Sequence, residues 1–299
     1  MGVLCDKYLV PPFSTLDTKQ GYWQSRKKDW RKIINSQEGR KDDLLGRGLK
    51  ELNEKYFGGS QGLNGTSIFD PVLCEVIYNW FGVDGGTVFD PFAGGSVRGI
   101  VAEMLGQRYI GIDLSQGQVD ANQIAADKLK VHPVWHCDDS RNANNYIDNE
   151  TADLIFSCPP YHNLEKYSDH PLDLSNMNYT DFLEAYTDII NIACNKLKNN
   201  RFAVFVVGDI RDKKGAYRDF VSETKQIYKS NGLCLYNEFV LLEQYGTAPV
   251  RASAVFRAKR KVVKVHQNIL VFYKGDIEQI SKIYNNNFNW ADLTQYVNC

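Results

Sequence analysis

The sequence predicts an α/β protein whose core is a doubly wound, mostly parallel sheet with an antiparallel edge strand. From residue 87 onward, short apolar segments alternate with segments of helical length, which is typical of strands joined by crossover helices. Acidic residues follow three successive strand segments, at the edge where open α/β sheets bind ligands. Near the C-terminus two strand-like segments follow each other with no predicted helix between them, which indicates an antiparallel pair.

Each element has a local signal of its own. Five apolar segments predict the strands 87–92, 108–114, 131–139, 152–157 and 201–209. Helical periodicity predicts three helices, at 96–106, which stops at Gly106, at 115–130, which opens on Ser115, and at 179–198. Residues 233–244 and 266–275 form the predicted antiparallel pair, which closes one edge. Strands this apolar are expected to carry helices on both faces of the sheet.

The composition excludes several classes of protein. The chain has 299 residues and a formal net charge of −1, so any contact with nucleic acid requires a local group of cations. The apolar runs are too short to span a bilayer, and we expect no membrane partner. The seven cysteines are scattered without a C-x-x-C pair, which argues against a zinc site or a disulfide scaffold. We therefore predict no metal, reduced thiols and a cytoplasmic location.

By composition the chain divides into three parts. Residues 1–65 form a basic N-terminal extension that ends in a Gly-rich connector, residues 66–275 carry the predicted sheet, and residues 276–299 form a polar C-terminal tail. Within the extension, Trp23 and Trp30 lie among basic residues, namely Arg26, Lys27, Lys28, Arg31 and Lys32. This pattern predicts an amphipathic helix, and a basic arm that touches phosphates is the alternative.

Three acids mark the predicted ligand-binding edge. Asp90 and the Gly94–Gly95 turn follow the first strand, but the G-x-G-x-x-G spacing of dinucleotide sites is absent. A carboxylate at this turn would repel a pyrophosphate and favour a cationic ligand, such as the amino acid end of S-adenosyl-L-methionine. Asp113 ends the second strand where a ribose-binding carboxylate is expected, and Asp139 ends the third, where it could accept from an adenine amino group. The alternative is that these acids only cap the helices that follow.

The fourth strand ends in Ser157–Cys158–Pro159–Pro160–Tyr161, and prolines cannot continue a central strand. "DPFAGGS" followed by "PPY" after the fourth strand resembles the amino-methylating DNA methyltransferases, which modify adenine N6 or cytosine N4. Residues 66–81 are similar to the segment that these enzymes place before the Gly-rich motif, and residues 246–275 resemble the C-terminal part of phage-borne members. The resemblance covers roughly residues 66–275.

The resemblance implies a class I S-adenosyl-L-methionine-dependent methyltransferase fold and a set of site residues. The implied cofactor-binding residues are Ser67, Phe69, Asp90, Phe92, Ala93, Gly94, Gly95, Asp113, Leu114 and Asp139. The implied catalytic residues are Ser157, Cys158, Pro159, Pro160 and Tyr161. In this family the carbonyl of the first proline and the side chain before it accept the hydrogens of the target amino group, and the tyrosine stacks on the flipped base.

The residue before the prolines departs from the family pattern, in which it is Asp, Asn or Ser. Cys158 carries a thiol, which is a weak acceptor, so Ser157 or a water could make this hydrogen bond instead. Serine at this position is most frequent in cytosine N4 enzymes, which keeps that specificity open. A nucleophilic Cys158 has no supporting signal, and a strand-end cysteine without a covalent role is the simpler interpretation.

Residues 250–264 carry six basic residues and no acid: Arg251, Arg257, Lys259, Arg260, Lys261 and Lys264. Between two strands that flank the predicted site, we expect a basic DNA-recognition insertion at about 245–265, although such runs are often solvated faces.

The sequence thus predicts a DNA methyltransferase that acts on a flipped base, with adenine N6 favoured. Alternatives are cytosine N4, RNA or protein glutamine as the target, or an inactive DNA-binding module. The expected partner is duplex DNA, a homodimer is possible, and the phage-type resemblance leaves a restriction–modification role open. The expected location is the cytoplasm of a bacterial or phage-infected cell.

Overall fold

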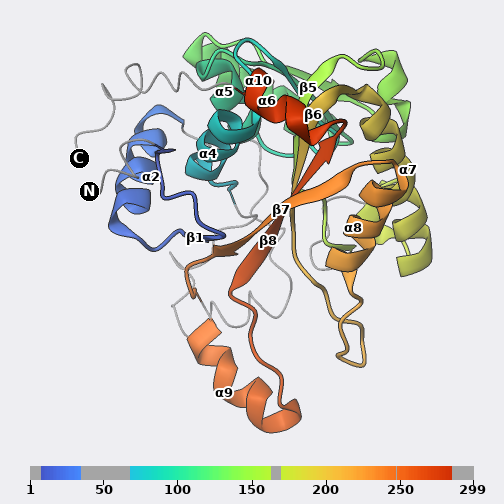
Figure 1. Cartoon of the computed structure of the whole chain (residues 1–299). Helices are drawn as coiled ribbons and strands as arrows, with labels where there is room; N and C mark the ends of the chain where they lie inside the picture. The colour runs from blue at the N-terminus through green and yellow to red at the C-terminus, as the bar shows by residue number, and fades with distance from the viewer. Residues whose placement is uncertain (1–7, 35–67, 163–169, 247, 285–299) are drawn as a thin grey trace.

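The computed structural model describes residues 8–34, 68–162, 170–246 and 248–284, and these form one twisted sheet with helices on both faces (Figure 1). The described strands are β1 (Thr15–Asp17), β2 (Thr87–Asp90), β3 (Arg108–Asp113), β4 (Val134–Cys137), β5 (Ala152–Ser157), β6 (Leu197–Val207), β7 (Cys234–Leu242) and β8 (His266–Lys274). Their order across the sheet is β1-β7-β8-β6-β5-β2-β3-β4.

Helices connect these strands. The described α-helices are α2 (Gly21–Ile33), α4 (Pro71–Phe81), α5 (Val97–Met104), α6 (Gln116–Leu129), α7 (Tyr179–Lys196), α8 (Phe220–Ser230), α9 (Ala248–Lys259) and α10 (Ile280–Ile283). Short 3-10 helices cover Ser140–Asn145 (η2), Leu174–Asn176 (η4) and Ile277–Gln279 (η5).

The direction of the strands confirms the predicted fold class. Strands β4, β3, β2, β5 and β6 are parallel neighbours, and β8 is antiparallel to both β6 and β7. The strand order reverses at β2, since β3 and β4 lie on one side of it and β5 and β6 on the other. The sheet is therefore doubly wound and mostly parallel, with one antiparallel strand near an edge.

Two apolar layers cover the sheet. Val88 of β2 points into a core that holds residues of α2, α4, α5 and α6, whereas its neighbour Phe89 points into a core built by α7 and α8. Successive residues of a strand face opposite sides, so one strand supplies both cores. Figure 1 shows the two groups of helices on opposite faces. In the described part of the chain, no helix combines the length and apolar character that crossing a membrane requires.

Several elements differ from the sequence-based expectation. β7 and β8 are connected through helix α9, so the prediction of no helix between them is wrong. The antiparallel pair does not end the sheet either, because β1 pairs in parallel with β7 outside it. Helix α8 was not predicted, although Phe220, Thr224, Ile227 and Tyr228 follow a helical spacing and are buried.

Residues 8–34 of the predicted N-terminal extension are part of the folded body. Its helix α2 buries Trp23 and Trp30, whose indole nitrogens donate to Asp70 and Glu75 at 3.1 Å and 2.7 Å. The Arg26 guanidinium pairs with the fully buried Glu75 of α4. The predicted amphipathic helix is confirmed, and Arg26 is not available to phosphates. The predicted connector at 57–67, Ser67 included, and most of the C-terminal tail lie outside the described residues.

Candidate functional site at the carboxyl edge of the sheet

The ends of β2, β3 and β5 lie side by side. β2 pairs with β3 through Asp90↔Gly111 and with β5 through Phe89↔Ile155, both in parallel. The hydroxyl of Ser157, the last residue of β5, donates to Asp90 Oδ1 at 2.5 Å. The Gly-rich turn after β2 and the proline turn after β5 therefore open at the same edge of the sheet.

The Gly-rich turn is fastened to β3. Gly94 adopts φ = 55°, a left-handed conformation that glycine allows without strain. Its N–H donates to Asp113 Oδ2 at 2.9 Å, and its carbonyl accepts from Asn122 Nδ2 of α6 at 2.8 Å. Ala93, fully buried, donates from its N–H to the Ile112 carbonyl at 3.0 Å. The turn thus holds a fixed shape before any ligand is bound.

Asp90 does not present an open carboxylate. It is fully buried, and Arg98 Nε and the Tyr109 hydroxyl donate to its Oδ2 at 2.5 Å and 2.7 Å. Burial is the largest single influence on Arg98 and acts against its charge, but Asp90, Tyr109 and Cys158 together raise the pKa of the guanidinium. The expectation that Asp90 receives a cationic ligand directly is therefore corrected: an internal cation already neutralises it.

Arg98 also shapes the turn itself. Its Nη2 donates to the Phe92 and Ala93 carbonyls at 2.6 Å and 2.7 Å, and its guanidinium lies 4.6 Å from the centre of the Phe69 ring. This buried arginine was missed by the sequence analysis because nothing in its local pattern distinguishes it from any other helical residue. It connects the segment before α4 with the Gly-rich turn.

Asp113 is partly buried at this edge, and among the described residues it forms no salt bridge. Its Oδ1 accepts from the Ser115 N–H at 2.8 Å and its Oδ2 from the Gly94 N–H at 2.9 Å. Burial raises the pKa of Asp113 to about 6, and these two N–H groups act in the opposite direction. The two N–H donors fix the orientation of the carboxylate. Leu114, also partly buried, follows it and lies beside Cys137 at the end of β4.

At the third strand end the acids are engaged locally. Asp139 caps η2 and pairs with Arg141, whose Nη2 lies 2.6 Å from Oδ2. Asp138 accepts from the Tyr146 hydroxyl at 2.9 Å, and the Tyr146 ring stacks on His136 with 4.1 Å between ring centroids. Asp139 therefore caps the short helix that follows it, which is the alternative that the sequence left open. The His136–Tyr146 stack at this edge was not predicted.

The proline turn brings Cys158 and Tyr161 together. The Cys158 Sγ lies 3.6 Å from the Tyr161 hydroxyl, which donates to the Val206 carbonyl of β6 at 3.4 Å. Pro159 is buried, and Cys158, Pro160 and Tyr161 are half-exposed. Ser157 is fully buried and donates to Asp90, so the expectation that it could replace the thiol as an acceptor for a ligand is corrected.

The aromatic residues near the turns pack inward. Phe92 contacts Tyr186 of α7 and Phe205 of β6 at centroid distances of 5.8 Å and 6.2 Å. Phe69 packs edge-on against Phe156 of β5 at 5.7 Å. Phe69 packs against the core on one face of the sheet and Phe92 against the core on the other, and Gly95 in the turn is partly exposed.

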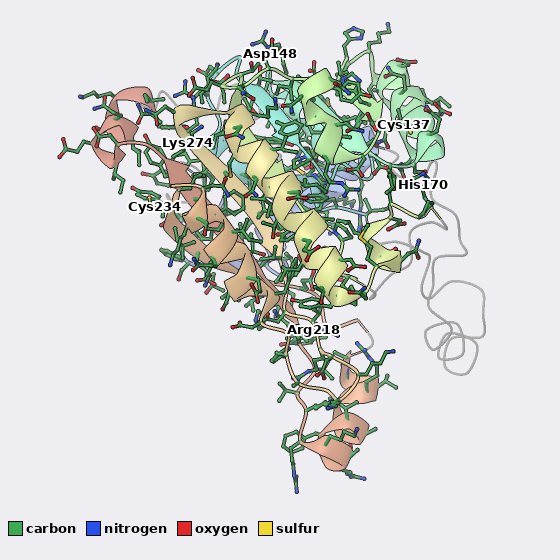
Figure 2. The ribbon with its side chains drawn as sticks, turned by 90° about the vertical axis from the view of Figure 1, so that its right-hand side faces the viewer. Cys137, Asp148, His170, Arg218, Cys234 and Lys274 are labelled. Carbon is green, nitrogen blue, oxygen red and sulfur yellow. The ribbon has the colours of Figure 1, made fainter. Side chains whose placement is uncertain are left out.

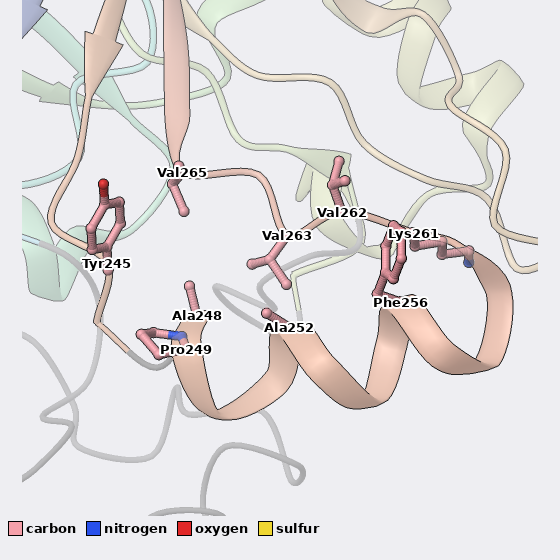
Figure 3. Close-up of a pocket in the computed structure, with 9 residues that line it drawn as sticks. All are labelled: Tyr245, Ala248, Pro249, Ala252, Phe256, Lys261, Val262, Val263 and Val265. Carbon is pink, nitrogen blue, oxygen red and sulfur yellow. The ribbon is translucent and has the colours of Figure 1, made fainter.

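The predicted basic insertion contains helix α9, which projects from the same edge of the sheet (Figure 1). Ala248 is the one buried residue of this helix. The helix lies within the connection between Leu242, the last residue of β7, and His266, the first residue of β8, which pair with each other. An apolar hollow of about 280 Å³ separates the helix from the returning segment around Val263 and Val265 (Figure 3). The helix thus stands away from the sheet and offers most of its surface to solvent.

The six predicted cations divide into two groups. Arg251, Arg257, Lys259 and Arg260 are exposed on or just after α9. Lys261 lines the hollow beneath the helix, and Lys264 is half-buried, donating to Asn268 Oδ1 at 3.3 Å. Burial lowers the pKa of Lys264, which lies close to Gly208 at the end of β6. Four of the six therefore form an open basic surface, and two lie at its base.

No protein-family model and no curated protein matches this chain. Solved structures with a similar fold include TrmN from Thermus thermophilus, with 17% identity, a TM-score of 0.45 and coverage of 69% of this chain and 49% of that one. The match therefore spans about half the length of TrmN. Magnesium protoporphyrin IX methyltransferase (ChlM) from Synechocystis PCC 6803, determined with bound SAM, shares 12% identity at a TM-score of 0.44. The match covers 83% of this chain and 90% of that one.

A geranyl diphosphate methyltransferase in complex with SAM shares 15% identity at a TM-score of 0.47, over 69% of this chain and 85% of that one. The chain has the class I methyltransferase fold, an assignment that rests on the order and direction of its own strands.

Proposed function

We propose that the protein is an S-adenosyl-L-methionine-dependent DNA methyltransferase that modifies the exocyclic amino group of a flipped base, with adenine N6 ahead of cytosine N4. One observation carries this proposal. The Gly-rich turn and the proline turn belong to adjacent parallel strands and are joined by the Ser157–Asp90 hydrogen bond, and a basic helix hangs from the same edge. A donor site and an acceptor site thus share one edge with a surface suited to phosphates.

The residues present fit the cofactor. Asp113 is held by two backbone N–H groups with its carboxylate at the sheet edge, the arrangement needed to accept the two hydroxyls of a ribose. Gly94 lets the main chain approach a ligand closely. Asp90 acts through Arg98, which fixes the Phe92 and Ala93 carbonyls, and is therefore a positioning residue. When bound, the cofactor supplies a methyl group on a sulfonium sulfur, an activated leaving group.

The proline turn serves the acceptor. An amino group conjugated to a base ring is a poor nucleophile, and acceptors around its two hydrogens favour a geometry in which the lone pair is free. The ring of Pro159 fixes its φ, and the following Pro160 restricts its ψ, so the Pro159 carbonyl keeps a narrow range of directions. Cys158 supplies a weaker acceptor than oxygen would, and Tyr161 offers a half-exposed ring for stacking on the base. Positioning of this kind is the main source of rate in this proposal.

In this proposal helix α9 binds the DNA backbone. Residues 248–264 contain six basic residues and no acidic one, so their positive charge is not balanced by acids nearby in sequence. Replacing Arg257, Lys259 and Arg260 with glutamine should reduce the salt dependence of duplex binding by about 0.9 in log–log slope for each phosphate that is no longer neutralised. Fluorescence anisotropy between low and high salt measures this slope. An unchanged slope would make α9 an ordinary solvated helix.

Product analysis tests the whole proposal. The protein is incubated with methyl-labelled cofactor and mixed-sequence duplex DNA, structured RNA or a protein extract, and the nucleic acids are digested to nucleosides. Label in N6-methyldeoxyadenosine is expected. Label in N4-methyldeoxycytidine would shift the target base, and label in RNA or protein alone would refute a DNA substrate. Binding of cofactor and DNA without any methyl transfer would identify an inactive DNA-binding module. The weak acceptor at Cys158 would then explain the loss of activity.

A further inference from the structure

A second basic projection lies beside α9, in the connection between β6 and α8. Residues 210–218 form a short hairpin: the Arg218 N–H donates to the Ile210 carbonyl, and the Asp212 N–H to the Ala216 carbonyl, both at 2.9 Å. Arg211 and Tyr217 pair across it as an antiparallel bridge. We call residues 210–218 the hairpin arm. Figure 1 shows it hanging from the same edge of the sheet as α9.

The hairpin arm is rigid by its own contacts. Asp212 Oδ1 accepts from the N–H groups of Gly215 and Ala216 at 2.6 Å and 2.9 Å, and Gly215 adopts φ = 100°, which favours glycine. Arg211 donates to the Gly215 carbonyl at 2.8 Å, and its guanidinium lies 3.8 Å from the centre of the Tyr217 ring. Tyr217 is nevertheless 45% exposed, so an aromatic ring is held in a fixed place facing solvent.

The hairpin arm contacts residues close to both the proline turn and helix α9. At its base the Arg218 guanidinium lies 4.1 Å from the centre of the Tyr179 ring, which packs against His162, the residue after Tyr161. Figure 2 shows Arg218 at the junction between the sheet and the projecting part. At its tip, Gly215 lies against the ammonium group of Lys261, just after α9, and a methyl group at Gly215 would collide with that nitrogen.

The charges of the arm favour an anionic partner. Lys213 and Lys214 at the tip are exposed, and within the described ranges neither forms a salt bridge. The acids nearby are engaged: Asp212 in the turn, Asp209 with the Val221 N–H at 3.2 Å, and Asp219 with the Ser222 hydroxyl at 2.7 Å. The tip therefore presents two cations and one aromatic ring on the same edge as the exposed cations of α9.

We propose that the hairpin arm is a second DNA-contacting surface, in which Lys213 and Lys214 bind backbone phosphates and Tyr217 packs against a nucleotide close to the target base. This inference rests on the proposed function and names a further part of its DNA interface. Duplex DNA is then held by α9 and by the arm, which both lie on the β6–β8 side of the proline turn. Exposed cations beside a fixed aromatic ring are suited to nucleic acids, because the cations neutralise phosphates and the ring stacks on a base.

Two variants and two controls test the arm. Lys213→Gln with Lys214→Gln removes the two tip cations, and Tyr217→Ala removes the ring while Tyr217→Trp keeps one. The charge-matched control is Lys128→Gln with Lys229→Gln; these exposed lysines lie in the last turns of α6 and α8, at the opposite edge of the sheet. Thermal unfolding and cofactor affinity are measured for every variant, to show that the fold and the cofactor site are intact.

Binding of a labelled duplex is measured by anisotropy across a series of salt concentrations. We expect the lysine double variant to lose up to about 1.8 in the log–log salt slope, and the control to lose none. Tyr217→Ala should bind roughly 5- to 150-fold more weakly, the range for one lost base stack, while Tyr217→Trp stays close to the wild type. A slope equal to that of the control, with unchanged affinity for Tyr217→Ala, would overturn the arm's role.

Duplex binding and methylation by the wild-type protein distinguish a failure of this inference from a failure of the proposed function. If it binds the duplex and methylates no base, the proposed function fails, and the salt slopes still decide the arm. If it methylates DNA and the arm variants behave as the control does, the arm alone is refuted. Absence of duplex binding, or a clear preference for a hairpin RNA of the same length, would overturn the arm as a DNA surface.

Discussion

Replacing Arg98 with methionine tests whether Asp90 is neutralised inside the protein. Arg98 donates to Asp90 at 2.5 Å and to the Phe92 and Ala93 carbonyls at 2.6 Å and 2.7 Å. Methionine fills a similar volume and makes none of these bonds. Because Asp90 is fully buried, its carboxylate then keeps only neutral donors, namely the Tyr109 and Ser157 hydroxyls and the Phe92 N–H.

The expected cost is large. Leaving one partner of a buried ion pair unpaired costs about 3–5 kcal/mol, against a total unfolding free energy of about 5–15 kcal/mol for a domain. Adding Asp90→Asn removes the orphaned charge, so the double variant should be more stable than Arg98→Met alone. Lys32→Met is the control, because Lys32 is 66% exposed and its pair with Asp29 contributes about 0.5 kcal/mol or less.

Urea unfolding, followed by circular dichroism, measures these differences. In Arg98→Met the buried carboxylate of Asp90 has no cationic partner, so this variant should unfold at a lower urea concentration than both Lys32→Met and the double variant. Two results would refute the reasoning: an Arg98→Met variant as stable as Lys32→Met, or a double variant no more stable than the single one. Asp90 would then be open to a ligand, as the sequence alone suggests.

Three further predictions concern the two halves of the site. Tyr161→Ala should lose turnover and keep cofactor affinity in calorimetry, whereas Tyr161→Phe keeps most of the rate; full activity of the alanine variant would contradict stacking. Cofactor affinity should fall as the pH drops below about 6, because Asp113 with its raised pKa becomes protonated and loses an acceptor, and Asp113→Asn should bind weakly with no such pH dependence. An affinity that is level from pH 5 to pH 8 would place the ribose elsewhere. Cys158→Ser should retain or increase methyl transfer, since a hydroxyl accepts better than a thiol, and complete loss in kinetic assays would favour a covalent role for the cysteine.

Local patterns in the sequence determined much of the architecture. The run at 152–157 is a strand over that whole range, and Ser115 caps α6 by accepting from the Gln118 N–H at 3.3 Å. Such features depend on side-chain alternation and on end groups within a few residues, which the sequence displays directly. The adjacency of the Gly-rich and proline turns also followed from the sequence, because successive parallel strands present their carboxyl ends at one edge.

Only the tertiary structure decided which charges are available at that edge. Asp90 is occupied by Arg98, Tyr109 and Ser157, which lie 8, 19 and 67 positions away along the chain, and Arg26 is occupied by Glu75, 49 positions away. Helix α9 buries almost nothing, so it lacks the apolar stripe by which helices are recognised, and its alanines were the one available signal. A buried ion pair is chosen by the packing of distant segments, and a local sequence pattern contains no record of that choice.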